Sequence, residues 1–267
     1  MDKIKVCVAG ATGWVGRSLI PAIHSSGDMS LVGAVSRSSC GKSVETVLGI
    51  KGLSVEIKPT VKNALEQRTD VLVDYTSPDS VKSNVLTAIR KGVSVVVGTS
   101  GLTDVDYEKI DREASKQEVG VIAAGNFAIS AALLLHFSEL AAKYMPSWEI
   151  IDFASSKKID APSGMTRELA FRLSKVRRPE SEIPVDGVTG IKEARGANID
   201  HTQVHSIRLP GTVIGAEVLF GRPDEKLSIR YDAGTSAMPY IEGTLLAVRR
   251  VREIKGLRRG LDTILDL

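Results

Sequence analysis

A chain of 267 residues, of which 43% are hydrophobic and 25% charged, has the length and composition of a soluble globular protein with one large domain or two small ones. Its 35 basic and 32 acidic residues give a net charge of +3, which argues against a nucleic-acid or membrane-surface role and favours anionic small molecules. With two cysteines, no apolar run near the ~20 residues that span a bilayer and no signal-peptide pattern, the sequence predicts a cytoplasmic protein in a reducing compartment.

The N-terminal segment predicts a nucleotide-binding turn. Residues 3–9 form a β-branched run typical of a buried parallel strand, and they lead through Gly10-Ala-Thr-Gly13-Trp-Val-Gly16 into a helical pattern. This G-x-x-G-x-x-G spacing is a variant of the dinucleotide fingerprint, whose glycines permit the tight turn, admit the pyrophosphate and let the helix pack on the strand. A purely structural turn is the alternative, but the position between a strand and a helix favours cofactor binding.

A second predicted strand, residues 29–35, ends in a basic and serine-rich turn. An acidic residue at this point would bind the ribose 2′-hydroxyl of NAD, whereas Arg37, Ser38 and Lys42 suit a 2′-phosphate. The turn therefore predicts NADPH as the cofactor, with NADH as the alternative, unless it is only a solvated basic loop.

Three further strands in the first half are each followed by a small polar cluster, at residues 76–79, 98–101 and 124–127. The alternation of strands and helices predicts an α/β fold with an N-terminal Rossmann-like, doubly wound parallel sheet. Because ligands of such sheets bind outside the carboxyl ends of the strands, we expect the three clusters to lie on one rim.

The second half has a different pattern, which predicts an α+β C-terminal domain with a mostly antiparallel sheet. A helix over residues 129–144 precedes four β-branched strands, and a last helix over 239–251 returns to the first domain. The expected domains are residues 1–127 with 238–267, and residues 128–237. Residues 178–202 read as a long polar loop, and His201 with His205 lack the further ligands of a metal site, so no metal is expected.

Residues 149–153 read as a buried strand, which is followed by a Lys157-Lys158 turn and by Pro162-Ser163-Gly164 in front of a helical pattern. A lysine next to the N–H groups of a helix start is an anion-binding arrangement. The alternative is a solvated Lys-Lys turn followed by an ordinary serine N-cap.

Taken together, the motifs resemble those of the dihydrodipicolinate reductase family over essentially the whole chain. They are the three glycines, residues 73–76 with Pro78, residues 97–101, residues 126–129, Lys158-Ile-Asp-Ala-Pro-Ser-Gly164, residues 194–197 and residues 204–211.

The resemblance implies a homotetrameric oxidoreductase in which NAD(P)H delivers a hydride to a small cyclic imine dicarboxylate. The first domain would bind the cofactor, and the second would bind the substrate and build the oligomer. Lys158 would be the cationic catalytic group, and Ser163, Gly164 and Met165 would hold a substrate carboxylate. The residues expected at the cofactor are Gly10, Thr12, Gly13, Trp14, Val15, Gly16, Arg37, Ser38, Thr76, Gly98, Thr99, Ser100, Asn126 and Phe127.

The sequence also departs from the family pattern. Ala154 and Ser155 stand where the family has a His-His pair, Met165 replaces a threonine, Gly125 replaces a proline, and a histidine expected near Gly215 is absent. These departures favour a reductase acting on a changed imine, with Lys158 or Ser155 as the catalytic proton donor. The standard 4-hydroxy-tetrahydrodipicolinate reduction of lysine and diaminopimelate biosynthesis is one alternative, and a non-catalytic, regulatory NADP-binding homologue is another.

Overall fold

In the computed structural model, which describes residues 2–267, the apolar run near the N-terminus forms β1 (Ile4–Ala9) inside a seven-stranded sheet. The strand order is β12-β6-β5-β4-β1-β2-β3, and all neighbouring strands are parallel. The order reverses between β1 and β4, which is the switch point at which doubly wound sheets bind ligands. The predicted Rossmann-like sheet is confirmed. The other strands are β2 (Met29–Val35), β3 (Ile57–Lys58), β4 (Val71–Asp74), β5 (Ser94–Val97), β6 (Gly120–Ala123) and β12 (Gly256–Arg259).

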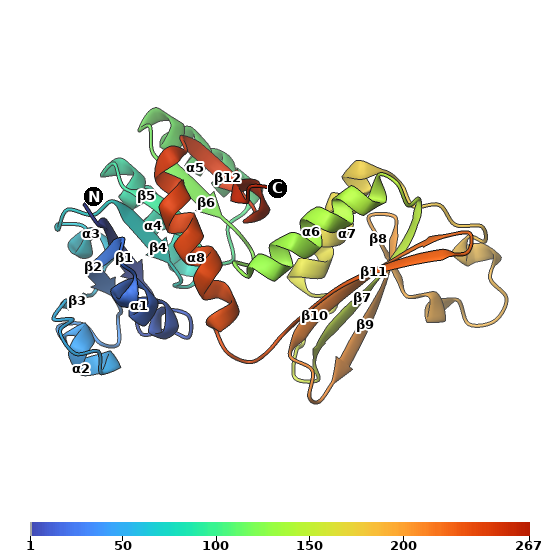
Figure 1. The fold of residues 1–267 in the computed structure, drawn as a ribbon, viewed down its shortest axis with the longest axis horizontal. Coiled ribbons are helices and arrows are strands. Elements are labelled where there is room, and N and C mark those ends of the chain that lie inside the picture. Colours follow the sequence, from blue (N-terminus) through green and yellow to red (C-terminus); the bar gives the residue numbers. More distant parts are fainter. Residues whose placement is uncertain (1) are drawn as a thin grey trace. The chain divides into compact units, whose positions relative to one another are not determined.

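Helices cover both faces of this sheet (Figure 1). On one face α1 (Gly16–Ser25) contacts α8 (Met238–Arg250), and on the other α4 (Pro78–Arg90) lies between α3 (Val61–Ala64) and α5 (Asp104–Lys116). A capping box of Thr103 and Asp106 starts α5, and Pro78 occupies the first turn of α4, where its missing N–H costs nothing. The short α2 (Val44–Leu48) follows β2.

The central strands are buried on both faces, as their valine-rich sequences predict. Their side chains on the α4 face pack with those of the helices in one apolar cluster that includes Cys7, Leu72, Val85, Val95 and Ile110. Burial, and secondarily the charge of Asp74, raises the pKa of the Cys7 thiol to about 12, so this cysteine stays protonated and inert. Cys7 and Cys40 are both free.

Two compact units make up the chain: unit 1 comprises Met1–Ile129 and Ala237–Leu267, and unit 2 comprises Ser130–Ser236. Residues 237–267 contribute to unit 1 α8, β12 and the 3₁₀ turns η3 (Val251–Glu253) and η4 (Asp262–Ile264). Strand β12, which the sequence pattern did not predict, pairs with β6.

Unit 2 contains a five-stranded sheet in the order β11-β10-β7-β9-β8. Three of its pairs are antiparallel and the β7–β9 pair is parallel, so the predicted mostly antiparallel sheet is confirmed. Its strands are β7 (Ser147–Ser155), β8 (Ala197–Ile199), β9 (Thr202–Leu209), β10 (Ile214–Arg222) and β11 (Glu225–Ala233), and its helices are α6 (Ile129–Ala142) and α7 (Gly164–Val176).

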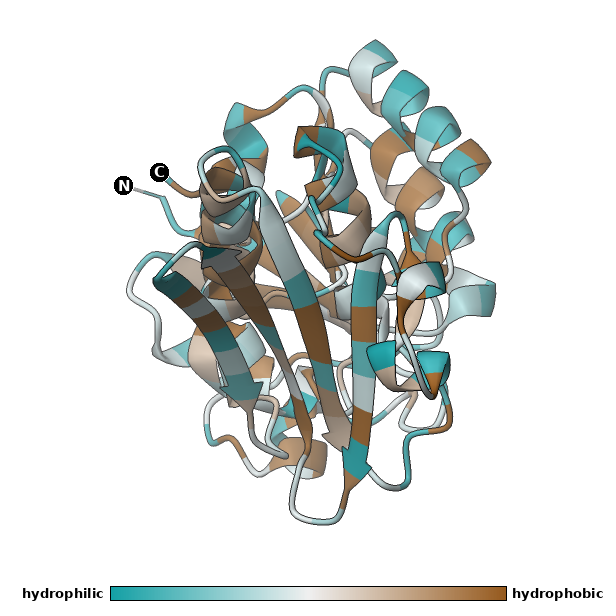
Figure 2. Cartoon of the chain, turned by 90° about the vertical axis from the view of Figure 1, so that its right-hand side faces the viewer, coloured by the Kyte–Doolittle hydropathy of each residue, from teal (hydrophilic) through white to brown (hydrophobic). Residues whose placement is uncertain are grey.

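Burial alternates along β7, so one face of this sheet is covered and the other is partly open. Figure 2 shows the matching alternation of apolar and polar segments along the strands. The predicted long loop contains β8 and the 3₁₀ turns η1 (Val185–Gly187) and η2 (Lys192–Arg195). Within residues 2–267, the helices are too short or too polar to cross a membrane.

Candidate active site

The glycine-rich turn after β1 has the close backbone packing that its spacing predicts. Gly10 has a φ of +84°, and a Cβ atom there would lie 2.0 Å from the Tyr75 carbonyl oxygen. A Cβ atom on Gly16, the first residue of α1, would lie 2.2 Å from the Gly10 carbonyl oxygen. Only glycine fits at these two positions, and together they bring the start of α1 against the end of β1. The resulting glycine-rich start of α1, with its backbone N–H groups, fits the pyrophosphate of a dinucleotide.

A buried carboxylate, Asp74 at the end of β4, organises the neighbouring loops. It accepts hydrogen bonds from the Thr76 hydroxyl at 2.7 Å, from the Thr99 hydroxyl at 2.7 Å and from the Asn84 amide at 2.9 Å. Thr99 Oγ1 in turn accepts the Thr76 backbone N–H at 2.7 Å. The polar clusters after β4 and β5 are thereby held together on one rim, as expected from the sequence.

A cleft of about 400 Å³ opens on this rim, within the size range of small-molecule sites. Its edge carries Trp14, which is 57% exposed and packs edge-on against Tyr240, with ring centroids 5.5 Å apart. Its floor carries the Tyr75 ring, against which Gly98 packs so closely that a Cβ atom would lie 2.1 Å from it. The residues lining the cleft are Gly13, Trp14, Val15, Tyr75, Thr76, Pro78, Gly98, Thr99, Ser100, Ala124, Gly125, Asn126, Phe127 and Tyr240.

Nine of the residues expected at the cofactor therefore line one cleft, and Gly10 with Gly16 builds its turn. The remaining three do not line the cleft: Arg37 and Ser38 follow β2, and Thr12 lies in the glycine-rich turn next to them. There the Thr12 hydroxyl is hydrogen-bonded to Ser36 at 2.7 Å, and Ser36 to Ser38 at 3.3 Å, while Arg37 is exposed. Sequence reasoning missed Tyr75 and Tyr240, for which the only signal was an aromatic residue beside a polar cluster or at a helix start.

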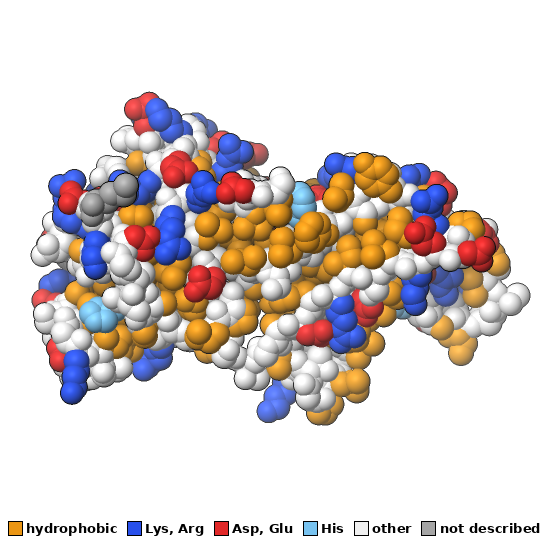
Figure 3. Space-filling model, in the orientation of Figure 1, with side chains coloured by type: hydrophobic (Ala, Val, Ile, Leu, Met, Phe, Trp, Pro, Cys, Tyr) orange, Lys and Arg blue, Asp and Glu red, His pale blue; other side chains and the backbone are white. Residues whose placement is uncertain are grey.

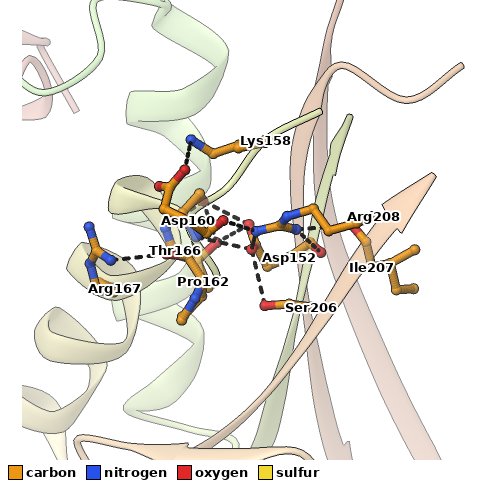
Figure 4. A network of polar contacts seen from close by, with 10 residues as sticks. Asp152, Lys158, Asp160, Pro162, Thr166, Arg167, Ser206, Ile207 and Arg208 are labelled. Atoms are coloured by element: carbon orange, nitrogen blue, oxygen red, sulfur yellow. Dashed lines mark hydrogen bonds and ion pairs between the residues drawn. The ribbon is translucent and has the colours of Figure 1, made fainter. Parts of the chain in front are cut away.

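In unit 2, the stretch after β7 is organised by the buried carboxylate of Asp152 (Figure 4). Asp152 is fully buried and pairs with Arg208 of β9, with Nη2 at 2.7 Å from Oδ2. It also accepts hydrogen bonds from the Ser163 backbone N–H at 3.0 Å, from the Ser163 hydroxyl at 2.7 Å, from the Thr166 hydroxyl at 2.9 Å and from the Ser206 hydroxyl at 3.2 Å.

The protonation state of Asp152 follows from these contacts. Burial alone would raise its pKa, but the hydrogen bonds from Ser163, Arg208 and Thr166 outweigh it and leave the pKa below the usual value. Asp152 is thus a buried carboxylate that stays ionised, because hydrogen-bond donors of the protein take the place of water around it. No local sequence pattern indicates this network, because Asp152 and Arg208 are 56 positions apart.

Lys158 lies on the loop between β7 and α7. Its ammonium group pairs with the Asp160 carboxylate at 2.6 Å, and both side chains remain partly exposed, at 31% and 40%. The Lys158 ammonium, and secondarily other groups that include Arg167, lowers the pKa of Asp160. The lysine is therefore a cation held in place at the protein surface.

The start of α7 lies a few residues further on. Ser163 is its N-cap, and the Ser163 oxygen accepts the Thr166 N–H at 3.4 Å while its hydroxyl donates to Asp152. The Ser163 side chain is buried, whereas Gly164 is exposed and Met165 half-buried. The residues expected at a substrate carboxylate thus form the first turn of a helix, and the Ser163 hydroxyl is already used by the protein. The Ala161–Pro162 peptide bond is cis.

The positions that depart from the family pattern differ in their surroundings. Ala154 is completely buried on the covered face of β7. Ser155 is half-buried at the end of the strand, and its hydroxyl oxygen accepts the Lys157 N–H at 3.3 Å. Of these two positions, only Ser155 has a side chain that reaches solvent.

A second polar cluster lies along β7 and β9 around Glu149. Its carboxylate pairs with His205 at 2.7 Å and with Arg195 of η2. His201 lies apart from it, in the β8–β9 turn, with a φ of +70°. Across residues 2–267, no three His, Cys, Asp or Glu side chains lie close enough together to hold a metal ion.

Known proteins resemble this chain over its full length. A family profile described as "Dihydrodipicolinate reductase, N-terminus" matches residues 4–127, and one described as "Dihydrodipicolinate reductase, C-terminus" matches residues 130–265. The 4-hydroxy-tetrahydrodipicolinate reductase of Desulfitobacterium hafniense is 38% identical and covers all of both chains. That of Moorella thermoacetica is 36% identical over 98% of each chain.

A solved structure is also similar. It is the dipicolinate-bound dihydrodipicolinate reductase from Paenisporosarcina sp. TG-14, which superimposes with a TM-score of 0.87 at 29% identity, over 98% of this chain and all of that one.

Proposed function

Since the chain belongs to the dihydrodipicolinate reductase family and is an NAD(P)H oxidoreductase, we propose that it is the 4-hydroxy-tetrahydrodipicolinate reductase of lysine and diaminopimelate biosynthesis. The observation that carries this proposal is full-length identity of up to 38% to relatives with that name, combined with an intact Lys158–Gly164 segment. The changed substrate that the missing histidines favoured has no support among these relatives. The standard reaction therefore replaces it as the first hypothesis.

In the proposed reaction unit 1 binds the cofactor, which supplies the hydride. The glycine turn and the start of α1 hold its pyrophosphate, and the cleft with Trp14 and Tyr240 accepts the remainder. The contacts between Asp74, Thr76 and Thr99 fix the rim before the cofactor arrives. This pre-organisation reduces the free-energy cost of binding.

Unit 2 binds the substrate through the Lys158 loop and the start of α7. The N–H groups and dipole of a helix start stabilise a carboxylate, so we assign one substrate carboxylate to Gly164 and Met165. Ser163 contributes as the N-cap that shapes this turn, because its hydroxyl donates to Asp152.

Lys158 provides the positive charge of the reaction. A cation beside the acceptor stabilises the negative charge that develops as the hydride arrives. The same ammonium can then give its proton to the reduced product. Ser155 is the second candidate for proton transfer, acting through a water molecule.

The cofactor preference is proposed to be NADPH. Arg37 is exposed just after β2, and its sequence neighbours Ser36 and Ser38 are hydrogen-bonded to one another and, through Ser36, to Thr12. These groups suit a 2′-phosphate, and no carboxylate follows β2 to bind a free 2′-hydroxyl. A comparison of the KM values for NADPH and NADH tests this point, and a clear preference for NADH would contradict it.

We also propose that the protein is a homotetramer. The open face of the unit 2 sheet leaves Ile151, Phe153 and Leu219 half-exposed. Hydrophobic side chains also gather on the surface over α6 (Figure 3). Phe137 and Leu140 of this helix are exposed, as is Tyr144 just after it. Exposed apolar patches of this kind mark interaction surfaces. Sedimentation should give four times the mass of one chain.

The main test is oxidation of NADPH with 4-hydroxy-tetrahydrodipicolinate, compared with a panel of other cyclic imines. The proposal requires the highest kcat/KM for the lysine-pathway substrate. A higher value for another imine would instead support a changed substrate, and no turnover of any imine despite cofactor binding would support a non-catalytic homologue.

A further inference from the structure

The loop that carries Lys158, residues 156–163, is attached to the protein core at two points, Asp160 and Ser163, by one buried ion pair. That pair joins Asp152 on β7 to Arg208 on β9, two parallel neighbours that end side by side. Asp152 is fully buried and the Arg208 side chain is 17% exposed, so solvent screens the pair little.

At the first point, in the middle of the loop, Arg208 holds the part that positions the lysine. The same Nη2 group that pairs with Asp152 also donates to the Asp160 backbone oxygen at 2.8 Å (Figure 4). The Asp160 carboxylate then pairs with Lys158. Arg208 therefore sets the position of the ammonium group through the backbone of Asp160, without contacting the lysine itself.

At the second point, where the loop leads into α7, Asp152 holds the start of the helix. Its Oδ2 accepts the Ser163 backbone N–H, and its Oδ1 accepts the Ser163 and Thr166 hydroxyl groups. These bonds fix the first turn of the helix, whose N–H groups are the proposed carboxylate site.

We propose that Asp152 and Arg208 are positioning residues, which hold the lysine and the carboxylate-binding helix start at a fixed separation without contacting the substrate. This inference rests on the function proposed for the Lys158 loop. A planar guanidinium can serve several acceptors in a fixed geometry, which a lysine ammonium cannot. A displacement of about 1 Å of a reacting group costs on the order of 10²-fold in rate.

The test compares Arg208→Lys with Ser206→Ala. Ser206 donates to the same Asp152 oxygen at 3.2 Å but makes no hydrogen bond to the loop, so its loss weakens the network without releasing the loop. Arg177→Lys, at the exposed Arg177–Glu180 pair of the same unit, controls for the exchange itself. Each variant is measured for kcat and KM with 4-hydroxy-tetrahydrodipicolinate, for NADPH Kd, for Tm and for the rate of trypsin cleavage after Lys157 and Lys158.

Arg208→Lys should lose about 10²-fold in kcat/KM, keep its NADPH Kd and be cleaved faster at the loop. Ser206→Ala should lower the Tm but keep kcat/KM within a few-fold of the wild type. Equal losses of kcat/KM in the two variants, or wild-type turnover and cleavage in Arg208→Lys, would overturn the inference.

The failure of the proposed function gives a different result, because the wild-type protein would then fail to reduce the lysine-pathway substrate. In that case trypsin cleavage and calorimetric binding of dipicolinate still test the positioning role. Faster cleavage and weaker binding in Arg208→Lys than in Ser206→Ala support it, and equal values refute it. Ser163→Ala, which removes one contact between Asp152 and the end of the loop, provides a further variant and should also be cleaved faster than the wild type; wild-type cleavage would contradict the role of Asp152.

Discussion

Replacing Gly16 by alanine should damage both the stability of unit 1 and its binding of NADPH. The new Cβ atom would lie 2.2 Å from the Gly10 carbonyl oxygen and 2.8 Å from that of Ala11, and both are backbone atoms that cannot rotate away. To reach an ordinary contact distance, the start of α1 must move by about 1 Å. Overpacking of this kind typically costs about 1–3 kcal/mol.

Two smaller effects act in the opposite direction. Alanine reduces the entropy of the unfolded chain and favours the helix, which together recover about 1 kcal/mol. The net loss of up to about 2 kcal/mol should lower the Tm by up to about 8 °C in a domain of this size. The moved helix start also loses donors to a charged phosphate, worth about 1.5–3 kcal/mol, so the NADPH Kd should rise about 10- to 100-fold.

Thermal unfolding and fluorescence titration measure these two effects. Trp14 lies at the edge of the cleft, whereas the second tryptophan, Trp148, is buried in unit 2, so NADPH should change mainly the emission of Trp14. Gly27→Ala is the matched control, because no atom lies within 4 Å of its Cβ position, and it should keep the wild-type Kd. The reasoning is refuted if Gly16→Ala has the Tm and the Kd of the wild type.

Three other predictions concern charged residues. Lys158→Ala should abolish turnover and leave the NADPH Kd unchanged, as measured by steady-state kinetics and titration; unchanged turnover would remove Lys158 from the mechanism. Arg37→Gln should weaken NADPH binding about 10- to 100-fold, because it removes a charged donor to the 2′-phosphate, and should leave NADH binding unaltered; equal effects on the two cofactors would contradict this assignment. The pKa of Asp152 is lower in the folded protein than its value of about 4 in the unfolded chain. The ionised carboxylate therefore contributes its full stabilisation above about pH 4, and this contribution is lost as the pH falls through the pKa of the folded state. Melting curves between pH 6 and pH 2.5 should therefore show a smaller loss of Tm on acidification in Asp152→Asn than in the wild type, and parallel losses would argue against this linkage.

The sequence predicted the elements whose signal is local. Strand β2 has the bounds that its apolar run predicts, and the glycine spacing identified the turn after β1. Strand β7 was predicted only over residues 149–153, because Ser147, Ala154 and Ser155 carry no strand signal. They are strand residues because β9 and β10 pair along the whole length of β7.

The candidate site was predictable only in part, because sequence patterns reveal local motifs but not contacts between distant segments. The residues of the nucleotide turn and the Lys158 loop are near one another in the sequence and form recognisable motifs. The partners of Asp152 and the ring of Tyr240 reach their sites from distant segments, which no periodicity reveals. Strand β12, with its sequence Gly-Leu-Arg-Arg, is a strand only because β6 offers it an edge.

The split composition of unit 1 has a consequence for the order in which the chain folds during synthesis. Its sheet is closed by β12 and covered by α8, both of which are translated after the whole of unit 2. Until residues 256–259 leave the ribosome, β6 has one unpaired edge and α1 lacks its neighbour α8. Unit 2, a continuous segment, can complete its sheet earlier, so the domain encoded first is the one that is finished last.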